Sequence, residues 1–209
     1  MAEGPKIVGD LLNEGFNPMA IFDDVEDVNR ISNLQHPQGV VGIFDIPDFS
    51  EEANSIDPNA LTIVLDGIQD PGNLGTIIRV ADWFGVNTIC CSPDTVDCWS
   101  PKVVQATMGS IARVHIYYAP LVQSLSSLPA DCPVYVTELE GDSIYEAPLK
   151  PQGVIVMGNE GKGVTQQVRK LATRHLLIPN YPKGKATAES LNVAIATALT
   201  LGEFRRRML

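Results

Sequence analysis

The chain has 209 residues, of which 44% are hydrophobic and 19% charged, and its formal net charge is −10. This composition is typical of a globular protein, and the length suits one well-buried domain plus a smaller unit. No apolar run reaches the roughly 20 residues that a membrane-spanning helix needs, and the N-terminus lacks a secretory signal pattern. The four cysteines form neither a C-x-x-C pair nor a cluster with histidines, so we expect a cytoplasmic protein without disulfides or a metal site.

The charge is unevenly distributed along the chain. Residues 1–60 carry twelve acidic residues against only Lys6 and Arg30, whereas residues 61–209 carry equal numbers of both signs. Within residues 162–209, nine basic residues stand against two acidic ones. Because an electrostatic footprint depends on clustering, this stretch favours a polyanionic partner. Its last three basic residues, 205–207, are equally typical of the final turn of a helix.

The first 47 residues predict a small α/β unit. Helical patterns cover Pro5–Glu14 and Val25–Ser32, and strand patterns cover Met19–Phe22 and Val40–Ile46. The pattern opens directly into a helix and is short for an independent domain, so we expect the unit to be incomplete. The acidic segment 48–59, poor in large apolar residues, predicts a linker.

Residues 60–209 predict one larger α/β domain. The expected strands are Leu61–Leu65, Val86–Cys91, Val114–Tyr117, Val134–Thr137, Val154–Met157 and Leu176–Ile178. The expected helices are Leu74–Phe84, Lys102–Met108, Pro120–Leu128, Gln166–Ala172 and Ser190–Arg207. Apolar strands that alternate with helices predict a mostly parallel sheet with helices on both faces. Such sheets bind ligands at the carboxyl ends of their strands, so the loops there are the candidate site.

The first of these loops has the sequence DPGN at residues 70–73. It predicts a turn with Asn73 at the N-cap of the next helix, and Arg79 follows about two turns later. Arg79 lies between apolar neighbours in the sequence, where an uncompensated cation would be costly. The structural alternatives are a simple helix cap for Asn73 and a surface ion pair for Arg79.

The second loop has the sequence GNEGKG at residues 158–163. Three glycines in six positions allow backbone groups to approach a ligand closely, and Glu160 adds a carboxylate. Gly163 follows Lys162 where a Walker A motif needs Ser or Thr, and the spacing is not that of a Rossmann fingerprint. A flexible turn is the structural alternative.

The third loop leaves a strand at Ile178, carries the sequence KGK at residues 183–185, and enters a helix at Ser190. Ser190 and Asn192 are residue types that often cap helices, which is their structural interpretation. The helix that follows is rich in alanine, which permits close backbone packing.

Together the three loops resemble the sequence motifs of the SpoU/TrmH-type RNA ribose 2′-O-methyltransferases of the SPOUT family. The resemblance covers nearly all of residues 61–209, including WSPKVVQATMGS at 99–110. HPQGVVGIF at 36–44 is similar to the end of the N-terminal RNA-binding domain of many members. The third loop is several residues longer than the family pattern, and the N-terminal domain is shorter. The resemblance implies a C-terminal trefoil knot that binds S-adenosyl-L-methionine.

The resemblance also implies roles for individual residues. It implies a catalytic group of five residues: Arg79, Asn73, Glu160, Ser190 and Asn192. It places contacts to S-adenosylmethionine at Thr137, Glu138, Gly158, Asn159, Gly161, Ile178 and Leu191. It further implies an RNA substrate, ribosomal RNA in preference to transfer RNA, and a homodimer in which Arg79 of one subunit meets the cofactor of the other.

Two other functions fit parts of the sequence. A non-catalytic RNA-binding module of the same fold predicts a broken motif, whereas all five catalytic candidates are present. A nucleotide-binding enzyme predicts a hydroxyl residue after Gly161-Lys162, which is absent. We expect the three histidines, His36, His115 and His175, to be structural or surface residues.

Overall fold

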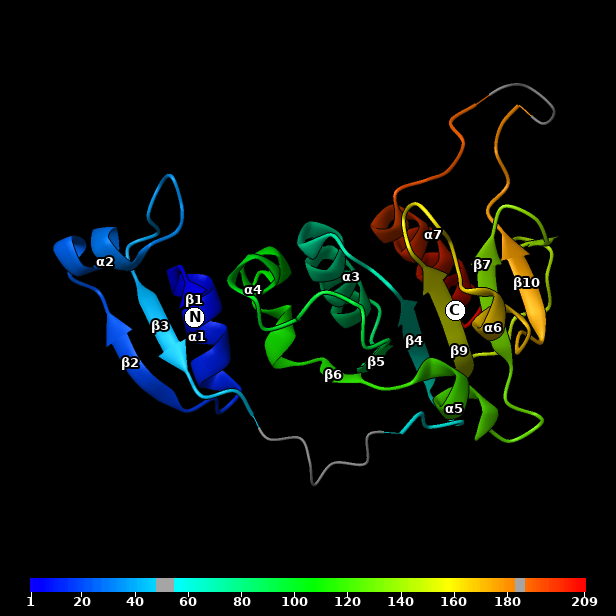
Figure 1. The fold of residues 1–209 in the computed structure, drawn as a ribbon, viewed down its shortest axis with the longest axis horizontal. Coiled ribbons are helices and arrows are strands. Elements are labelled where there is room, and N and C mark those ends of the chain that lie inside the picture. Colours follow the sequence, from blue (N-terminus) through cyan, green and yellow to red (C-terminus); the bar gives the residue numbers. More distant parts are fainter. Residues whose placement is uncertain (48–54, 183–186) are drawn as a thin grey trace.

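The structure is a computed structural model that describes residues 1–47, 55–182 and 187–209. It contains two sheets, which Figure 1 shows toward opposite ends of the molecule. The N-terminal sheet has three antiparallel strands in the order β1-β3-β2. The larger sheet has seven strands in the order β6-β5-β4-β9-β7-β10-β8, and its strand pairs are all parallel.

The strands of the large sheet are β4 Leu61–Asp66, β5 Thr88–Cys91, β6 His115–Tyr118, β7 Val134–Glu138, β8 Asp142–Ser143, β9 Gly153–Gly158 and β10 Arg174–Leu177. Its helices are α3 Pro71–Trp83, α4 Pro101–Thr107, α5 Leu121–Ser126, α6 Gln166–Arg169 and α7 Val193–Arg206, with a 3₁₀ turn η1 at Ser110–Ala112. Every element predicted in this region is present, with ends that shift by up to three residues. The two-residue strand β8 was not predicted because it is too short to show a period.

Helices cover both faces of the sheet, as predicted. Along β4, Ile63 and Leu65 belong to the core beneath α3, α4 and α7, whereas Val64 belongs to the core beneath α5 and α6. This split follows from the two-residue period of a strand. Burial of each such side chain contributes roughly 1.5–3 kcal/mol, so the alternation fixes the register of the sheet. Residues 48–54 of the predicted linker, 48–59, lie outside the described ranges. Ile56, within the described part of the linker, is buried in the second core.

Strand β10 lies between β7 and β8, although β7 and β8 are separated by only residues 139–141 in the chain. The end of α7 is fastened to the segment that follows β8, because the guanidinium of Arg207 donates to the carbonyl oxygens of Ile144 and Ala147. Strand β10 therefore inserts between β7 and β8, and the C-terminal Arg207 is hydrogen-bonded to the segment that follows β8. This arrangement is consistent with the predicted trefoil knot, whose path includes residues 183–186, outside the described ranges.

The N-terminal unit consists of β1 Ala2–Glu3, α1 Pro5–Asn13, β2 Pro18–Phe22, α2 Val25–Ile31 and β3 Val41–Phe44. The expectation that the chain opens directly into a helix was wrong, because β1 pairs with β3 before α1 begins. The buried side chains of α1 belong to the same core as those of α3 and α4. The unit is therefore docked on the larger domain as well as linked to it.

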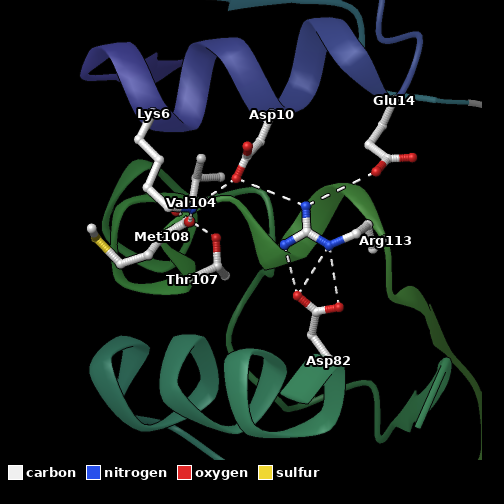
Figure 2. Close-up of polar contacts among 8 residues, drawn as sticks. All are labelled: Lys6, Asp10, Glu14, Asp82, Val104, Thr107, Met108 and Arg113. Atoms are coloured by element: carbon white, nitrogen blue, oxygen red, sulfur yellow. Dashed lines mark hydrogen bonds and ion pairs between the residues drawn. The ribbon is translucent and has the colours of Figure 1, made fainter. Parts of the chain in front are cut away.

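Polar contacts reinforce this docking, as Figure 2 shows. The Lys6 ammonium donates to the carbonyl oxygen of Met108, 2.6 Å away. Arg113 forms a bidentate pair with Asp82 of α3, at 2.7 Å, and its guanidinium lies 3.8 Å from the carboxylate of Asp10 in α1. One arginine thus joins a helix of each unit.

Candidate active site

The three candidate loops meet at the carboxyl edge of the large sheet. The Asn73 side-chain amide donates to the Glu160 carboxylate at 2.9 Å, and the Asn192 amide donates to the Asn73 side-chain oxygen at 2.8 Å. Residues more than 80 positions apart in the chain are therefore joined through one amide. Asn73 comes from α3, Glu160 from the loop after β9, and Asn192 from the start of α7.

Asn73 is free for this role because it does not cap its helix. The prediction that Asn73 is the N-cap of α3 was wrong, since α3 begins at Pro71 and Asp70 is the cap. The Asp70 carboxylate accepts from the Asn73 backbone amide at 2.7 Å. Proline at the first helical position sets this earlier start.

The GNEGKG loop forms a hydrogen-bonded turn. The Asn159 side-chain oxygen accepts from the amides of Gly161 and Lys162, both at 2.9 Å. Its side-chain nitrogen donates to the carbonyl oxygen of Gly67, after β4, at 2.7 Å. The Asn159 backbone N–H and C=O are hydrogen-bonded to Gly163, so Asn159 shapes the loop through both its side chain and its backbone.

Asp66, the last residue of β4, supports the site but was not among the residues predicted from the sequence. Its side chain is 4% exposed and accepts from the Thr165 backbone amide at 2.7 Å, which fixes the far end of the GNEGKG loop. The signal in the sequence is an acidic residue that ends an otherwise apolar strand. At Gly158, a Cβ atom would lie 2.3 Å from the Val164 nitrogen, so only glycine allows the loop to fold back so closely.

The predicted cofactor residues lie along three neighbouring strands. β9, β7 and β10 are adjacent in the sheet, and their carboxyl ends carry Gly158, Glu138 and Ile178 respectively. Leu177 pairs in register with Glu138, so these ends are level. The row of strand ends provides backbone amides and carbonyls for an elongated ligand.

The polar side chains in this row are already engaged. The Thr137 hydroxyl donates to the carbonyl oxygen of Val156 at 2.9 Å. The Glu138 carboxylate pairs with Arg169 at 2.6 Å and with the ring of His175, which confirms a structural role for that histidine. What remains is backbone together with the apolar side chains of Ile178 and Leu191. These groups fit a cofactor held mainly by main-chain hydrogen bonds and apolar contacts.

Arg79 is not buried in an apolar environment, contrary to the expectation from its neighbours. The buried face of α3 consists of Leu74, Ile77, Ile78 and Ala81, and Arg79 lies on the exposed face of the helix. It forms no hydrogen bond or ion pair with another described residue, which also excludes the surface ion pair considered for it within these ranges. Its guanidinium is therefore available to an external group.

Of the predicted residues in the third loop, Asn192 contacts the first loop, whereas Ser190 forms no hydrogen bond with the described residues of the other loops. Helix α7 begins at Val193 rather than Ser190, and Asn192 is its N-cap, with a side-chain oxygen that accepts from the amides of Ala194 and Ile195. Asn192 thus caps the helix and contacts Asn73 at the same time. Ser190 precedes the helix, is exposed, and forms no hydrogen bond with another described residue. Lys183, Gly184 and Lys185 lie outside the described ranges.

Most of the described basic side chains in residues 162–209, the stretch predicted to bind a polyanion, form ion pairs or hydrogen bonds within the protein. Arg169 pairs with Glu138 and Arg174 with Asp142. The three arginines at the end of α7, Arg205, Arg206 and Arg207, bind backbone carbonyls or Glu203. For these three residues the interpretation as a helix end is correct. Most of the cations described in this stretch are therefore not free for a polyanion.

Comparison with known proteins agrees with this geometry. The model of the SpoU rRNA Methylase family matches residues 60–202. The chain belongs to this family. A curated relative, the 23S rRNA (guanosine-2′-O-)-methyltransferase RlmB of Neisseria meningitidis, is 30% identical over 91% of this chain and 78% of its own length. An uncharacterized tRNA/rRNA methyltransferase of Synechocystis is 33% identical over 87% of this chain, which spans 65% of that relative.

Among solved structures, an AdoMet-bound rRNA methyltransferase from Sinorhizobium meliloti has 30% sequence identity and a TM-score of 0.86, with 100% of this chain and 87% of that chain covered. Family membership confirms the predicted resemblance and enzyme class, an RNA methyltransferase that depends on S-adenosylmethionine. Among the described residues, no helix is long and apolar enough to cross a membrane. Within the same ranges, no group of three or more His, Cys, Asp or Glu residues is arranged to hold a metal ion.

Proposed function

We propose that this protein transfers a methyl group from S-adenosylmethionine to a ribose 2′-hydroxyl of RNA, with ribosomal RNA as the favoured substrate. The observation that carries this proposal is the chain of hydrogen bonds from Glu160 through Asn73 to Asn192, which joins the three motif loops beside the row of strand ends. The 2′-O-specific RlmB relative and the ribosomal RNA enzymes among the matches support the choice of substrate.

Methyl transfer to a hydroxyl requires the oxygen, the methyl carbon and the sulfur to lie in line. When bound, S-adenosylmethionine supplies an electrophilic methyl group on a sulfonium. The protein must orient the ribose and stabilise the negative charge that develops on its oxygen. Asn73, Glu160 and Asn192 form a fixed polar surface suited to orienting a ribose, and Ser190 adds an exposed hydroxyl beside it.

We assign charge stabilisation to Arg79. A guanidinium with a pKa above about 12 is a poor proton acceptor, so Arg79 acts as an electrostatic stabiliser and orienter of the 2′-oxygen and the adjoining phosphate. Its exposed side chain leaves its donors available for this contact.

The variant Arg79→Lys tests this assignment. It keeps the charge but loses the planar fork, so we expect kcat to fall at least tenfold while S-adenosylmethionine still binds. Calorimetry with S-adenosylmethionine and a methyl-transfer assay on ribosomal RNA give the two readouts. Near-normal turnover in the lysine variant would remove Arg79 from the central role.

A homodimer with a shared active site completes the proposal. α3 and α7 are in contact, and both expose apolar side chains: Trp83 is 85% exposed, and Ile195 and Leu199, one turn apart, are 52% and 42% exposed. A surface of this kind is typical of a subunit interface. Arg79 lies one turn from Trp83 on α3, so an interface there brings Arg79 toward the neighbouring subunit.

Mixing two inactive variants tests the shared site. Arg79→Ala removes the guanidinium, and Gly158→Arg blocks the GNEGKG loop. If Arg79 acts on the partner's cofactor, mixed dimers regain one intact site and activity returns to about one quarter to one half of wild type. No recovery, with dimers shown by analytical ultracentrifugation, contradicts a shared site.

The proposal also includes a role for the N-terminal unit and a cellular location for the protein. We assign residues 1–47 to RNA substrate recognition, 48–59 to a linker and 60–209 to methyl transfer, in a protein that acts in the cytoplasm. The HPQGVVGIF segment supports the first assignment, and the acidity of residues 1–60 limits it, because acidic surfaces repel phosphates.

A further inference from the structure

An exposed aromatic side chain lies in the loop that joins β10 to Asn192 of the proposed site. Tyr181 is 91% exposed, and it makes no hydrogen bond or ring contact with another described residue. By contrast, Tyr117 and Tyr135 are buried, and the Tyr118 hydroxyl is hydrogen-bonded. An exposed ring is ordinary when it is isolated, so the position of Tyr181 decides its meaning.

The position of Tyr181 is set by the loop that carries part of the site. The loop leaves β10 after Leu177 and returns to Asn192, which binds Asn73. The Asn180 amide donates to the Thr187 hydroxyl at 2.9 Å, which ties the outgoing limb to the returning one. Figure 1 shows both described limbs, 178–182 and 187–192, extending past the carboxyl ends of the strands. Tyr181 therefore lies in a loop whose two ends border the proposed ribose site.

Most described arginines near the C-terminus are paired within the protein, so a contact with RNA that needs no free cation would add affinity at this site. Arg169, Arg174 and residues 205–207 are engaged by carboxylates or carbonyls. Phosphate contacts normally dominate affinity for nucleic acids, and this stretch offers few free cations among its described residues. Stacking of one base on an aromatic ring contributes about 1–3 kcal/mol and tolerates any base.

We propose that Tyr181 stacks on an unpaired base of the RNA substrate next to the methylated nucleotide. This inference rests on the proposed function and adds a base-binding contact to it. Single-stranded loops and bulges expose bases for such stacking, and their riboses are accessible to an enzyme.

Binding of a fluorescein-labelled single-stranded RNA of about 12 nucleotides, followed by anisotropy, tests the proposal. Tyr181→Phe keeps the ring and should bind as wild type does. Tyr181→Leu keeps apolar bulk without a π-face and should weaken binding at least about fivefold, as should Tyr181→Ala. Tyr145→Ala, which removes another exposed tyrosine, is the matched control and should change nothing. Calorimetry should show the same affinity for S-adenosylmethionine in every variant.

Three results would overturn the stacking proposal. They are RNA binding by Tyr181→Leu equal to wild type, a loss of S-adenosylmethionine affinity in that variant, and a change of oligomeric state. The second places the ring on the cofactor, and the third places it at a subunit contact. Failure of the proposed function itself looks different, because the wild-type protein would then bind no S-adenosylmethionine or methylate no RNA.

Discussion

At the scale of single residues, the site depends on side chains that satisfy two groups at once. Asn73 joins Glu160 to Asn192, and Asn159 joins its own loop to Gly67. An amide suits these positions because it donates through nitrogen and accepts through oxygen. A carboxylate at either place can only accept when ionised, so the isosteric change to Asp removes one bond and retains the other.

Asn159→Asp isolates the bond to Gly67. The new carboxylate still accepts from the amides of Gly161 and Lys162 but faces the Gly67 carbonyl without a proton to donate. Loss of such a bond costs about 1–3 kcal/mol, so we expect S-adenosylmethionine to bind about tenfold more weakly, as measured by calorimetry. The control is Asn17→Asp, which removes the hydrogen bond that the Asn17 side-chain amide donates to Asp45 in the N-terminal unit. It should leave cofactor affinity unchanged. Equal affinities in both variants contradict this role for Asn159.

At the scale of elements, the sequence predicted the alternation of strands and helices because apolar periodicity reflects burial on two faces. The same reasoning failed where hydrogen bonds decide the outcome. The start of α3 depends on the Asp70 cap rather than on Asn73, and α7 starts at its Asn192 cap rather than at Ser190. The hydrogen bonds of the C-terminal arginines could not be predicted from apolar periodicity either, since they reach residues as distant in the chain as Ile144.

The end of α7 predicts a dependence of stability on acid. Glu203 is buried, and hydrogen bonds from Arg206 and then Arg207 lower its pKa from 4.5 to about 2. Because the pKa is lower in the folded state, the carboxylate stabilises the fold fully above pH 4.5, and this contribution is lost as the pH falls toward 2.

Glu203→Gln should therefore lower the free energy of unfolding at pH 7 by about 1.5–3 kcal/mol, and its stability should fall less than that of wild type between pH 5 and pH 2. Urea unfolding across this pH range measures both effects. Parallel pH profiles for the two proteins would contradict the assignment to Glu203.

At the scale of the whole molecule, the N-terminal unit is held in place by a shared core and by Arg113 (Figure 2). Contacts of α1 thus help to set its position relative to the active site. The sequence predicted the unit and the linker but not the docking, because contacts between distant charged residues leave no periodic signal.

Arg113→Met keeps the aliphatic stem of the side chain and removes its ion pairs. Partly exposed pairs contribute about 1 kcal/mol or less each, so we expect amide hydrogen exchange in Pro5–Asn13 to accelerate a few-fold. Exchange in β4 and β9 should stay unchanged, because the ion pairs of Arg113 are to Asp10, Glu14 and Asp82 and not to either strand. Unaltered exchange in α1 would show that apolar packing alone holds the unit.

The most direct test of the three-loop site is the chemical identity of its product. Ribosomal RNA from cells lacking the gene is incubated with the protein and labelled S-adenosylmethionine, digested to nucleosides, and analysed by mass spectrometry. We predict label on a ribose 2′-oxygen with the wild-type protein and at least about a hundredfold less with Asn73→Ala, which breaks the link between the loops. Label on a base, or cofactor binding without any methyl transfer, as a non-catalytic RNA-binding module would give, would contradict the account.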